Sequence, residues 1–169
     1  MITNNVTRLL TSRHIPFQAF ELPPEKVSAL ETAQRLGVPP DQVYKTIVIL
    51  PELNTKPVLA VIPATHVVDL KAIACCLNRK KVHLATQRQA EQLTGLQTGG
   101  ISPLALLQRG YQVLLDSSAE MHNSIHISGG QRGLNIRLPV KALRDLTHAR
   151  VCEISSPAQE PADLNQSNP

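Results

Sequence analysis

The chain has 169 residues, of which 42% are hydrophobic and 18% charged, and its formal net charge is +4. A chain of this length and composition can bury a hydrophobic core as one globular domain, without help from metals or disulfides. Two Phe, two Tyr and no Trp exclude a module that binds single-stranded nucleic acid mainly by stacking bases on aromatic rings. The positive charge fits an anionic partner without requiring one.

Neither a membrane span nor a secretory signal is visible in the sequence. No apolar run approaches the roughly 18 residues of a span, and the N-terminus lacks a basic region followed by an apolar one. The cysteines, Cys75, Cys76 and Cys152, are odd in number and match no zinc spacing, so we expect no disulfide framework, no metal and no cofactor. We expect Cys75 and Cys76 to be small buried residues, and a reducing cytoplasm to be the location of the protein.

Apolar spacing and turn residues predict alternating helices and strands along the chain. Helices are expected around 6–10, ending before Pro16, around 30–36, ending at Gly37, and at 70–77, 87–93 and 140–146. Strands are expected at 17–22, 43–50, 56–64, 82–85, 113–115, 124–128, 134–138 and 150–154. Asp69 is placed as an N-cap, and Thr86 with Gln89 has the spacing of a capping box.

The strands at 43–50 and 56–64 are apolar on both faces, which predicts a hairpin in the middle of a sheet. The fold class is therefore α+β, a single domain with a mixed, curved, barrel-like sheet surrounded by helices. We place the domain at residues 2–154. Residues 155–169 are polar and Pro-rich, and we expect a disordered tail there.

Lys45 is the only charged residue in the strand at 43–50, on the same face as Val43 and Ile47. The side chain either extends past the strand start into water or lies at the mouth of a cavity, where a cation can meet a phosphate, carboxylate or polarised carbonyl. Thr46 is expected on the opposite face.

Two Gly-rich segments could line such a cavity. The loop at 95–103 contains Gly99 and Gly100, whose backbone N–H groups can face an oxygen, and Pro103 fixes its exit. It is neither a Walker A loop nor a Rossmann fingerprint, and an ordinary turn remains open. The segment at 126–136 has the pattern of a hairpin, in which Ser128 and the neighbouring glycines could form another wall.

Other groups give weaker signals. His122 and His126 are four apart in an expected strand, too far apart for one metal. No G-x-S-x-G motif for a Ser-His-Asp triad is present. A basic cluster that could contact a polyanion, or simply face solvent, comprises Lys71, Arg79, Lys80 and Lys81.

The motifs together resemble a known family. The segments DQVYKT (41–46), VDLK (68–71), GGISP (99–103), ISGG (127–130) and RGL (132–134) occur in the order of the YbaK/EbsC family of aminoacyl-tRNA deacylases. These are free-standing relatives of the editing domain of bacterial prolyl-tRNA synthetases. The resemblance covers residues 4–154, and the GGISP loop together with the DQVYKT strand makes it specific.

The resemblance implies hydrolysis, in trans, of the ester that joins a wrong amino acid to tRNA, most typically cysteine on tRNA for proline. A prolyl-tRNA synthetase could supply part of the affinity for tRNA. Lys45 matches the family's functional lysine. The positions implied to bind substrate are Phe20, Thr46, Gly99, Gly100, Ile101, Ser102, Pro103, Ser128, Gly129 and Asn135.

The family picture has the thiol of the substrate attack its own ester carbonyl, which would explain the lack of a triad or metal and would make the cysteines of the enzyme spectators. Two positions depart from the family pattern: Phe20 stands where a tyrosine is expected, and Asn135 where some relatives have an acid. A deacylase for alanine, serine or threonine esters therefore stays open. A non-catalytic tRNA- or nucleotide-binding module of the same fold, or an interaction domain that uses the basic cluster, also stays open.

Overall fold

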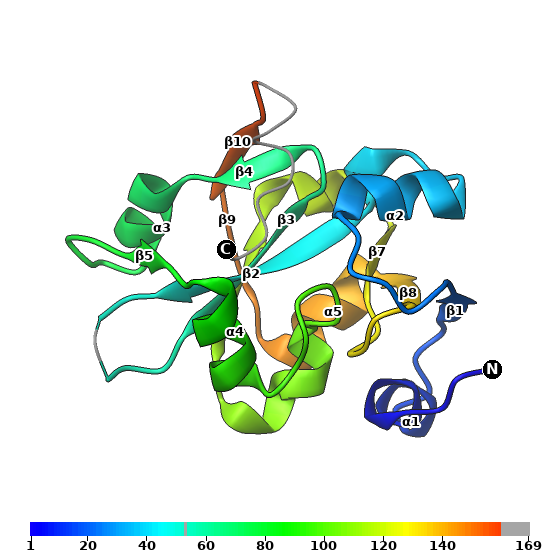
Figure 1. Cartoon of the computed structure of the whole chain (residues 1–169). Helices are drawn as coiled ribbons and strands as arrows, with labels where there is room; N and C mark the ends of the chain where they lie inside the picture. Colours follow the sequence, from blue (N-terminus) through cyan, green and yellow to red (C-terminus); the bar gives the residue numbers. More distant parts are fainter. Residues whose placement is uncertain (53, 160–169) are drawn as a thin grey trace.

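The computed structural model describes residues 1–52 and 54–159 (Figure 1). Its α-helices are α1 (Asn5–Ser12), α2 (Ala29–Leu36), α3 (Leu70–Cys76), α4 (Gln87–Thr94) and α5 (Val140–Thr147), with 3-10 helices η1 (Pro40–Gln42), η2 (Pro103–Arg109) and η3 (Ser117–Met121). The strands are β1 (Gln18–Glu21), β2 (Tyr44–Leu50), β3 (Val58–Pro63), β4 (His66–Val68), β5 (His83–Leu84), β6 (Gln112–Asp116), β7 (Ser124–Ser128), β8 (Leu134–Pro139), β9 (Arg150–Cys152) and β10 (Ser155–Pro157). No described helix is long and apolar enough to cross a bilayer.

The strands form three sheets. The largest has the order β5-β2-β3-β6-β9, and it is mixed because β2 and β3 are antiparallel whereas β3 and β6 are parallel. The second has the order β1-β8-β7, and the third pairs β10 with β4. A single parallel bridge between Val43 and His126 joins the first two sheets. The mixed sheet with surrounding helices confirms the α+β class, although the sheets do not close into one barrel.

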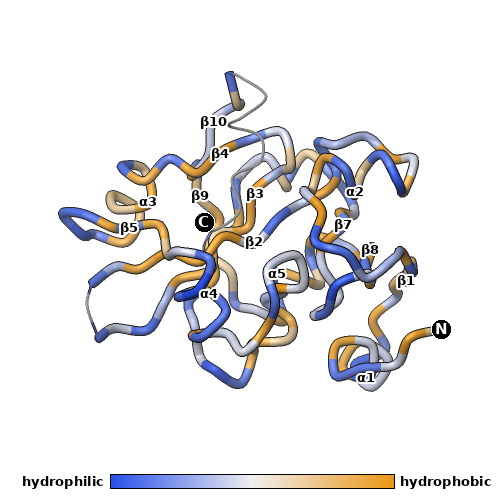
Figure 2. The backbone as a smooth tube through the Cα atoms, viewed as in Figure 1, coloured by the Kyte–Doolittle hydropathy of each residue, from blue (hydrophilic) through white to orange (hydrophobic). Residues whose placement is uncertain are grey.

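The β2–β3 hairpin lies in the middle of the large sheet, as predicted, because both of its faces are buried. Tyr44 and Val48 of β2 pack into the larger apolar cluster, whereas Ile47 and Ile49 pack into a second cluster together with α3. Figure 2 shows the same pattern, with apolar residues concentrated along the central strands and polar residues in the outer loops. The hairpin therefore holds the start of β2 rigidly in place.

The helix-start signals in the sequence are also confirmed. Asp69 Oδ1 accepts the N–H of Ala72 at 3.0 Å. Thr86 and Gln89 form the reciprocal capping box, with the two hydrogen bonds at 3.1 and 2.9 Å. These side chains satisfy backbone donors that have no partner inside a helix.

The expected boundary at residue 154 is too early. Ser155–Pro157 form β10, which pairs antiparallel with β4, and the Ser155 hydroxyl lies 2.8 Å from Nδ1 of His66. The polar composition of this stretch does not indicate a strand. A strand forms nevertheless, because pairing at a sheet edge uses backbone groups and does not require apolar side chains. The rest of the expected tail, residues 160–169, lies outside the described residues.

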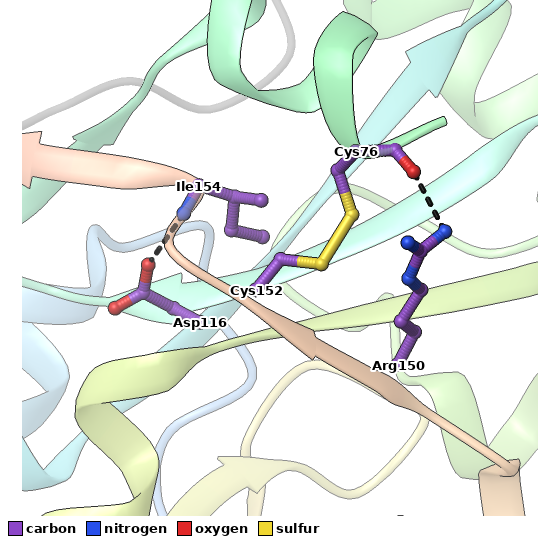
Figure 3. Close-up of a disulfide and its surroundings, with 5 residues drawn as sticks. All are labelled: Cys76, Asp116, Arg150, Cys152 and Ile154. Carbon is purple, nitrogen blue, oxygen red and sulfur yellow. Dashed lines mark hydrogen bonds between the residues drawn. A yellow bond between two sulfur atoms is a disulfide. The ribbon is translucent and has the colours of Figure 1, made fainter. Parts of the chain in front are cut away.

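Cys76 and Cys152 form a disulfide between α3 and β9, contrary to our expectation from the cysteine count (Figure 3). The two residues are 76 positions apart in sequence, and they meet because α3 packs on the cluster that also contacts β9. Beside them, Arg150 donates to the carbonyl of Cys76 at 2.7 Å. The third cysteine, Cys75, is an exposed free thiol, whereas we expected it to be buried. The cysteines therefore no longer support the expected cytoplasmic location.

Candidate functional site

The candidate site is a cavity of about 350 Å³ at the junction of the two larger sheets. We call it the seam cavity. Its walls are the start of β2, α2 with the segment before it, the loop at 98–101, and the facing ends of β7 and β8. The bridge between Val43 and His126 brings these walls together, because it fixes β7 against the chain that enters β2.

Lys45 is partly buried on β2 and lines the seam cavity. Burial lowers the pKa of Lys45 to about 8, because the charged form loses hydration there. At neutral pH the side chain is therefore still mainly a cation, inside a site with little water. Such a cation is suited to stabilise negative charge that develops on an oxygen. Thr46 lines the same cavity, so the opening reaches both faces of the strand at this point.

The Gly-rich loop contributes fewer groups to the cavity than the motif suggests. Gly99 and Ile101 line the cavity, but the N–H of Gly100 donates to the carbonyl of Gln97 at 2.8 Å and is taken. A Cβ on Gly100 would lie 2.8 Å from Cα of Gln131. Gly100 is therefore required for close backbone packing, and not for contact with a ligand.

Ser102 and Pro103 build the exit of this loop. Both are buried outside the seam cavity, and Oγ of Ser102 accepts the N–H of Leu104 at 3.2 Å at the start of η2. Pro103 takes the first position of that helix, which suits a residue without an N–H. These two residues position the loop rather than touch a ligand.

Thr98 is a cavity residue that the sequence analysis missed. Nε of Arg132 donates to its carbonyl at 2.7 Å, and its own N–H donates to Oε2 of Glu91 at 3.0 Å. The second hydrogen bond also lowers the pKa of Glu91. The hydroxyl Oγ1 of Thr98 is the one buried side-chain polar atom without a partner among the residues that the structure describes. Buried polar atoms are normally paired, so this hydroxyl is a candidate contact for a ligand.

Strands β7 and β8 supply a polar wall of the cavity. Ser128 and Asn135 are directly paired across the strands, and both line the cavity. Oδ1 of Asn135 lies 2.9 Å from Nδ1 of His126, and both residues are buried. Phe20, paired with Asn135 from β1, places its ring 5.5 Å from that of His126. Phe20 packs against His126 of this wall but does not line the cavity.

The seam cavity thus collects some of the expected site residues and leaves others outside. Those that line it are Lys45, Thr46, Gly99, Ile101, Ser128 and Asn135. Those that do not are Phe20, Gly100, Ser102, Pro103 and Gly129. Gly129 lies behind the wall, where a Cβ would come within 2.5 Å of Leu134. Besides Thr98, α2 and Tyr44 line the cavity without having been predicted, and the Tyr44 hydroxyl lies 2.8 Å from Oγ of Ser118. Tyr44 belongs to the DQVYKT segment but was not singled out there, and no motif marks α2.

The lining residues that the structure describes include no cysteine and no histidine. Within residues 1–52 and 54–159, no three His, Cys, Asp or Glu side chains gather in a way that could hold a metal. In the basic cluster, Arg79 forms an ion pair with Glu52. The cavity therefore offers the cations of Lys45 and Lys26, the carboxylates of Glu25 and Glu31, amide and hydroxyl groups and loop backbone, a set suited to position and polarise a substrate that is already reactive.

Known proteins share the sequence pattern and the fold of this chain. The pattern of the family described as "Aminoacyl-tRNA editing domain" matches residues 23–146. The chain is 30% identical over 154 residues to the "Putative Cys-tRNA(Pro)/Cys-tRNA(Cys) deacylase EbsC" of Enterococcus faecalis (strain ATCC 700802 / V583), a match that covers 90% of this chain and 93% of that protein.

Two solved structures share the fold. The crystal structure of the hypothetical protein APE2540 superposes with a TM-score of 0.81 at 21% identity, over 90% of this chain and all of the other. A second, described as "a putative trans-editing enzyme for prolyl tRNA synthetase", gives a TM-score of 0.76 at 23% identity, over 92% of this chain and 99% of the other.

The fold that surrounds the cavity is thus that of an editing domain. The chain belongs to the aminoacyl-tRNA editing family, and the resemblance to the YbaK/EbsC deacylases that its motifs indicated is confirmed.

Proposed function

We propose that the protein hydrolyses the ester of mischarged tRNA in trans, and that cysteine on tRNA for proline is its substrate. The observation that carries the proposal is the lysine cation of Lys45, which lines the seam cavity together with Asn135 and Gly99. An aminoacyl ester is reactive enough that positioning and charge stabilisation can supply the catalysis without a nucleophile from the enzyme.

In the proposed reaction the thiolate of the bound cysteine attacks its own ester carbonyl. A bond forms between sulfur and the carbonyl carbon, the bond from that carbon to the ribose oxygen breaks, and the ribose oxygen takes a proton from water. The thiolactone that leaves is opened by a water molecule to give free cysteine. Lys45 stabilises the negative charge that passes through the carbonyl oxygen.

The identity of the substrate is supported from two directions. The Enterococcus relative is named for Cys-tRNA(Pro) and Cys-tRNA(Cys). The cysteines of this chain stay away from the cavity, because Cys76 and Cys152 are bonded to each other and Cys75 is exposed on α3. A thiol at the reacting centre is then best supplied by the substrate.

The partners follow from this role. The protein meets the acceptor end of a charged tRNA, and a prolyl-tRNA synthetase that has just released the tRNA is the proposed second partner. Editing of this kind acts where translation takes place, in the cytoplasm.

The test is a deacylation assay on tRNA for proline charged separately with cysteine, alanine, serine and proline. The wild-type protein is compared with Lys45→Ala and with Lys141→Ala, a control on the exposed side of α5. We expect rapid loss of cysteine alone, abolished by Lys45→Ala and unchanged by the control, with both variants folded.

Each other result is informative. Loss of alanine or serine instead of cysteine would keep the editing activity and replace the substrate. Decay of every ester at the spontaneous rate, with synthetase present, would refute the proposal and favour a binding module.

A further inference from the structure

The polar wall of the seam cavity contains a hydrogen bond whose direction can be assigned. Burial lowers the pKa of His126 below its usual value, so the ring is neutral at pH 7 and carries one N–H. Its Nδ1 lies 2.9 Å from Oδ1 of Asn135, and a carbonyl oxygen can only accept. The proton of His126 therefore sits on Nδ1 and is donated to Asn135.

This bond fixes which end of the Asn135 amide faces the cavity. Oδ1 is turned toward His126, so Nδ2 points the other way. Nδ2 has no hydrogen bond among the residues that the structure describes, and it is not among their buried unpaired atoms. It is therefore open to the cavity that Asn135 lines.

We propose that His126 is a positioning residue, which holds the Asn135 amide so that its nitrogen donates a hydrogen bond to an acceptor oxygen of the aminoacyl ester. The inference rests on the proposed function for the identity of the ligand. Asn135 and Lys45 then both present N–H donors to the cavity that they line, so the group they bind is the ester or ribose oxygen and not the ammonium group of the amino acid.

Phe20 contributes to holding His126 in position. Its ring packs at 46° against that of His126, and the two residues lie on the same face of the β1-β8-β7 sheet. The Phe20 ring and the burial of His126 leave the imidazole little freedom to turn. The orientation of Asn135 is therefore set before a ligand arrives, which lowers the cost of binding.

The first experiment observes the proton directly. A long-range ¹H–¹⁵N correlation spectrum of the ¹⁵N-labelled protein at neutral pH distinguishes the two neutral forms of His126. We expect the form with hydrogen on Nδ1, and the form with hydrogen on Nε2 would overturn the proposal. This result does not depend on catalysis, so it is separable from failure of the proposed function.

The second experiment tests contact with the ligand. Adenosine that carries cysteine through a 3′-amide is a non-hydrolysable probe, and its addition should shift the side-chain NH₂ signals of Asn135. Binding of the probe without any change in these signals would refute the assigned contact, whether or not the protein cleaves esters.

The third experiment is a double-mutant cycle of His126→Phe and Asn135→Ala, with kcat/KM of deacylation as the readout. Loss of one hydrogen bond to the reacting group corresponds to roughly a tenfold fall for each single variant. Because His126 acts through Asn135, the double variant should be no slower than Asn135→Ala alone. Fold losses that multiply would show a merely structural role and overturn the proposal.

Two further variants keep the cycle interpretable. His122→Phe changes a histidine beside Tyr44 and should leave kcat/KM unchanged. Asn135→Asp has the same shape and keeps the oxygen that accepts from His126, but it replaces the NH₂ donor by an acceptor. This variant tests the proposed contact even if His126→Phe does not fold. We expect a loss as large as that of Asn135→Ala, whereas retained or increased activity would mean that the ammonium group lies at this wall.

Discussion

Replacement of Lys45 by methionine should stabilise the protein while it abolishes editing. Methionine has a similar length but no charge, so it removes the cost of keeping a cation inside the seam cavity. The difference between about 10.5 in the unfolded chain and about 8 for the pKa of the folded lysine corresponds to about 3 kcal/mol. We therefore expect the free energy of unfolding of Lys45→Met to exceed that of the wild type by about 2 to 3 kcal/mol near pH 7.

The pH dependence of this gain provides the sharper test. Below about pH 8 both folded and unfolded chains hold the proton, and the cost is fully present. Between about pH 8 and 10.5 the unfolded chain holds more protons than the folded one, so the wild type gains stability as the pH rises. The advantage of the variant should fall to about 1 kcal/mol near pH 9.5.

The assay is urea unfolding of both proteins at the two pH values, with the exposed Lys71→Met as a control that should stay within about 0.5 kcal/mol of the wild type. Near pH 7 the melting temperature of Lys45→Met should also rise by roughly 5 °C or more. Two results would refute this reasoning: Lys45→Met is less stable than the wild type, or its gain in free energy of unfolding is the same at both pH values. Either result would mean that burial of the Lys45 cation does not cost stability.

Four further results are expected. The deacylation rate, corrected for spontaneous hydrolysis, should pass through a maximum and fall above about pH 8, because Lys45 loses its charge there while the substrate thiol ionises near its usual pKa of about 8.5; a rate constant that keeps rising up to about pH 9.5 would contradict a cationic role. Thr98→Val should raise the melting temperature, because it removes an unpaired buried hydroxyl that costs about 1 to 3 kcal/mol, and should raise KM if that hydroxyl contacts the substrate. Gly100→Ala should lower stability by about 1 to 3 kcal/mol, since its Cβ would meet backbone at 2.8 Å, and unchanged urea unfolding would refute that contact. Cys152→Ser should lower stability by up to about 4 kcal/mol, as loop closure over 76 positions implies, whereas the control Cys75→Ser should change little; equal effects would show that the disulfide does not form.

Most of the fold could be predicted from the sequence because local signals agree with tertiary packing. The hairpin of β2 and β3 is apolar on both faces, and the capping residues Asp69 and Thr86 mark true helix starts. The short strands β4 and β10 were missed, because two or three residues of pairing leave no periodic pattern. The disulfide was missed because sequence spacing says nothing about the contact between α3 and β9.

The site was predictable to the extent that chemistry distinguishes residues. A lone lysine in an apolar strand pointed to Lys45, and two Gly-rich segments pointed to Gly99 and Ser128. Motif reasoning could not separate loop residues that line the cavity from those that build the loop, such as Ser102. Nor could it find Thr98, because a threonine becomes informative only when its neighbours leave its hydroxyl unpaired.

The single bridge between Val43 and His126 has an evolutionary consequence. The apolar clusters pack within and around the sheets, whereas the polar lining of the seam cavity, Lys45, Thr46, Ser128 and Asn135, belongs to none of them. The polar lining can therefore change without repacking a core, whereas apolar lining residues such as Ile101 and Leu134 belong to the larger cluster and cannot. A lineage with this architecture can drift between amino-acid specificities while its fold stays under separate selection.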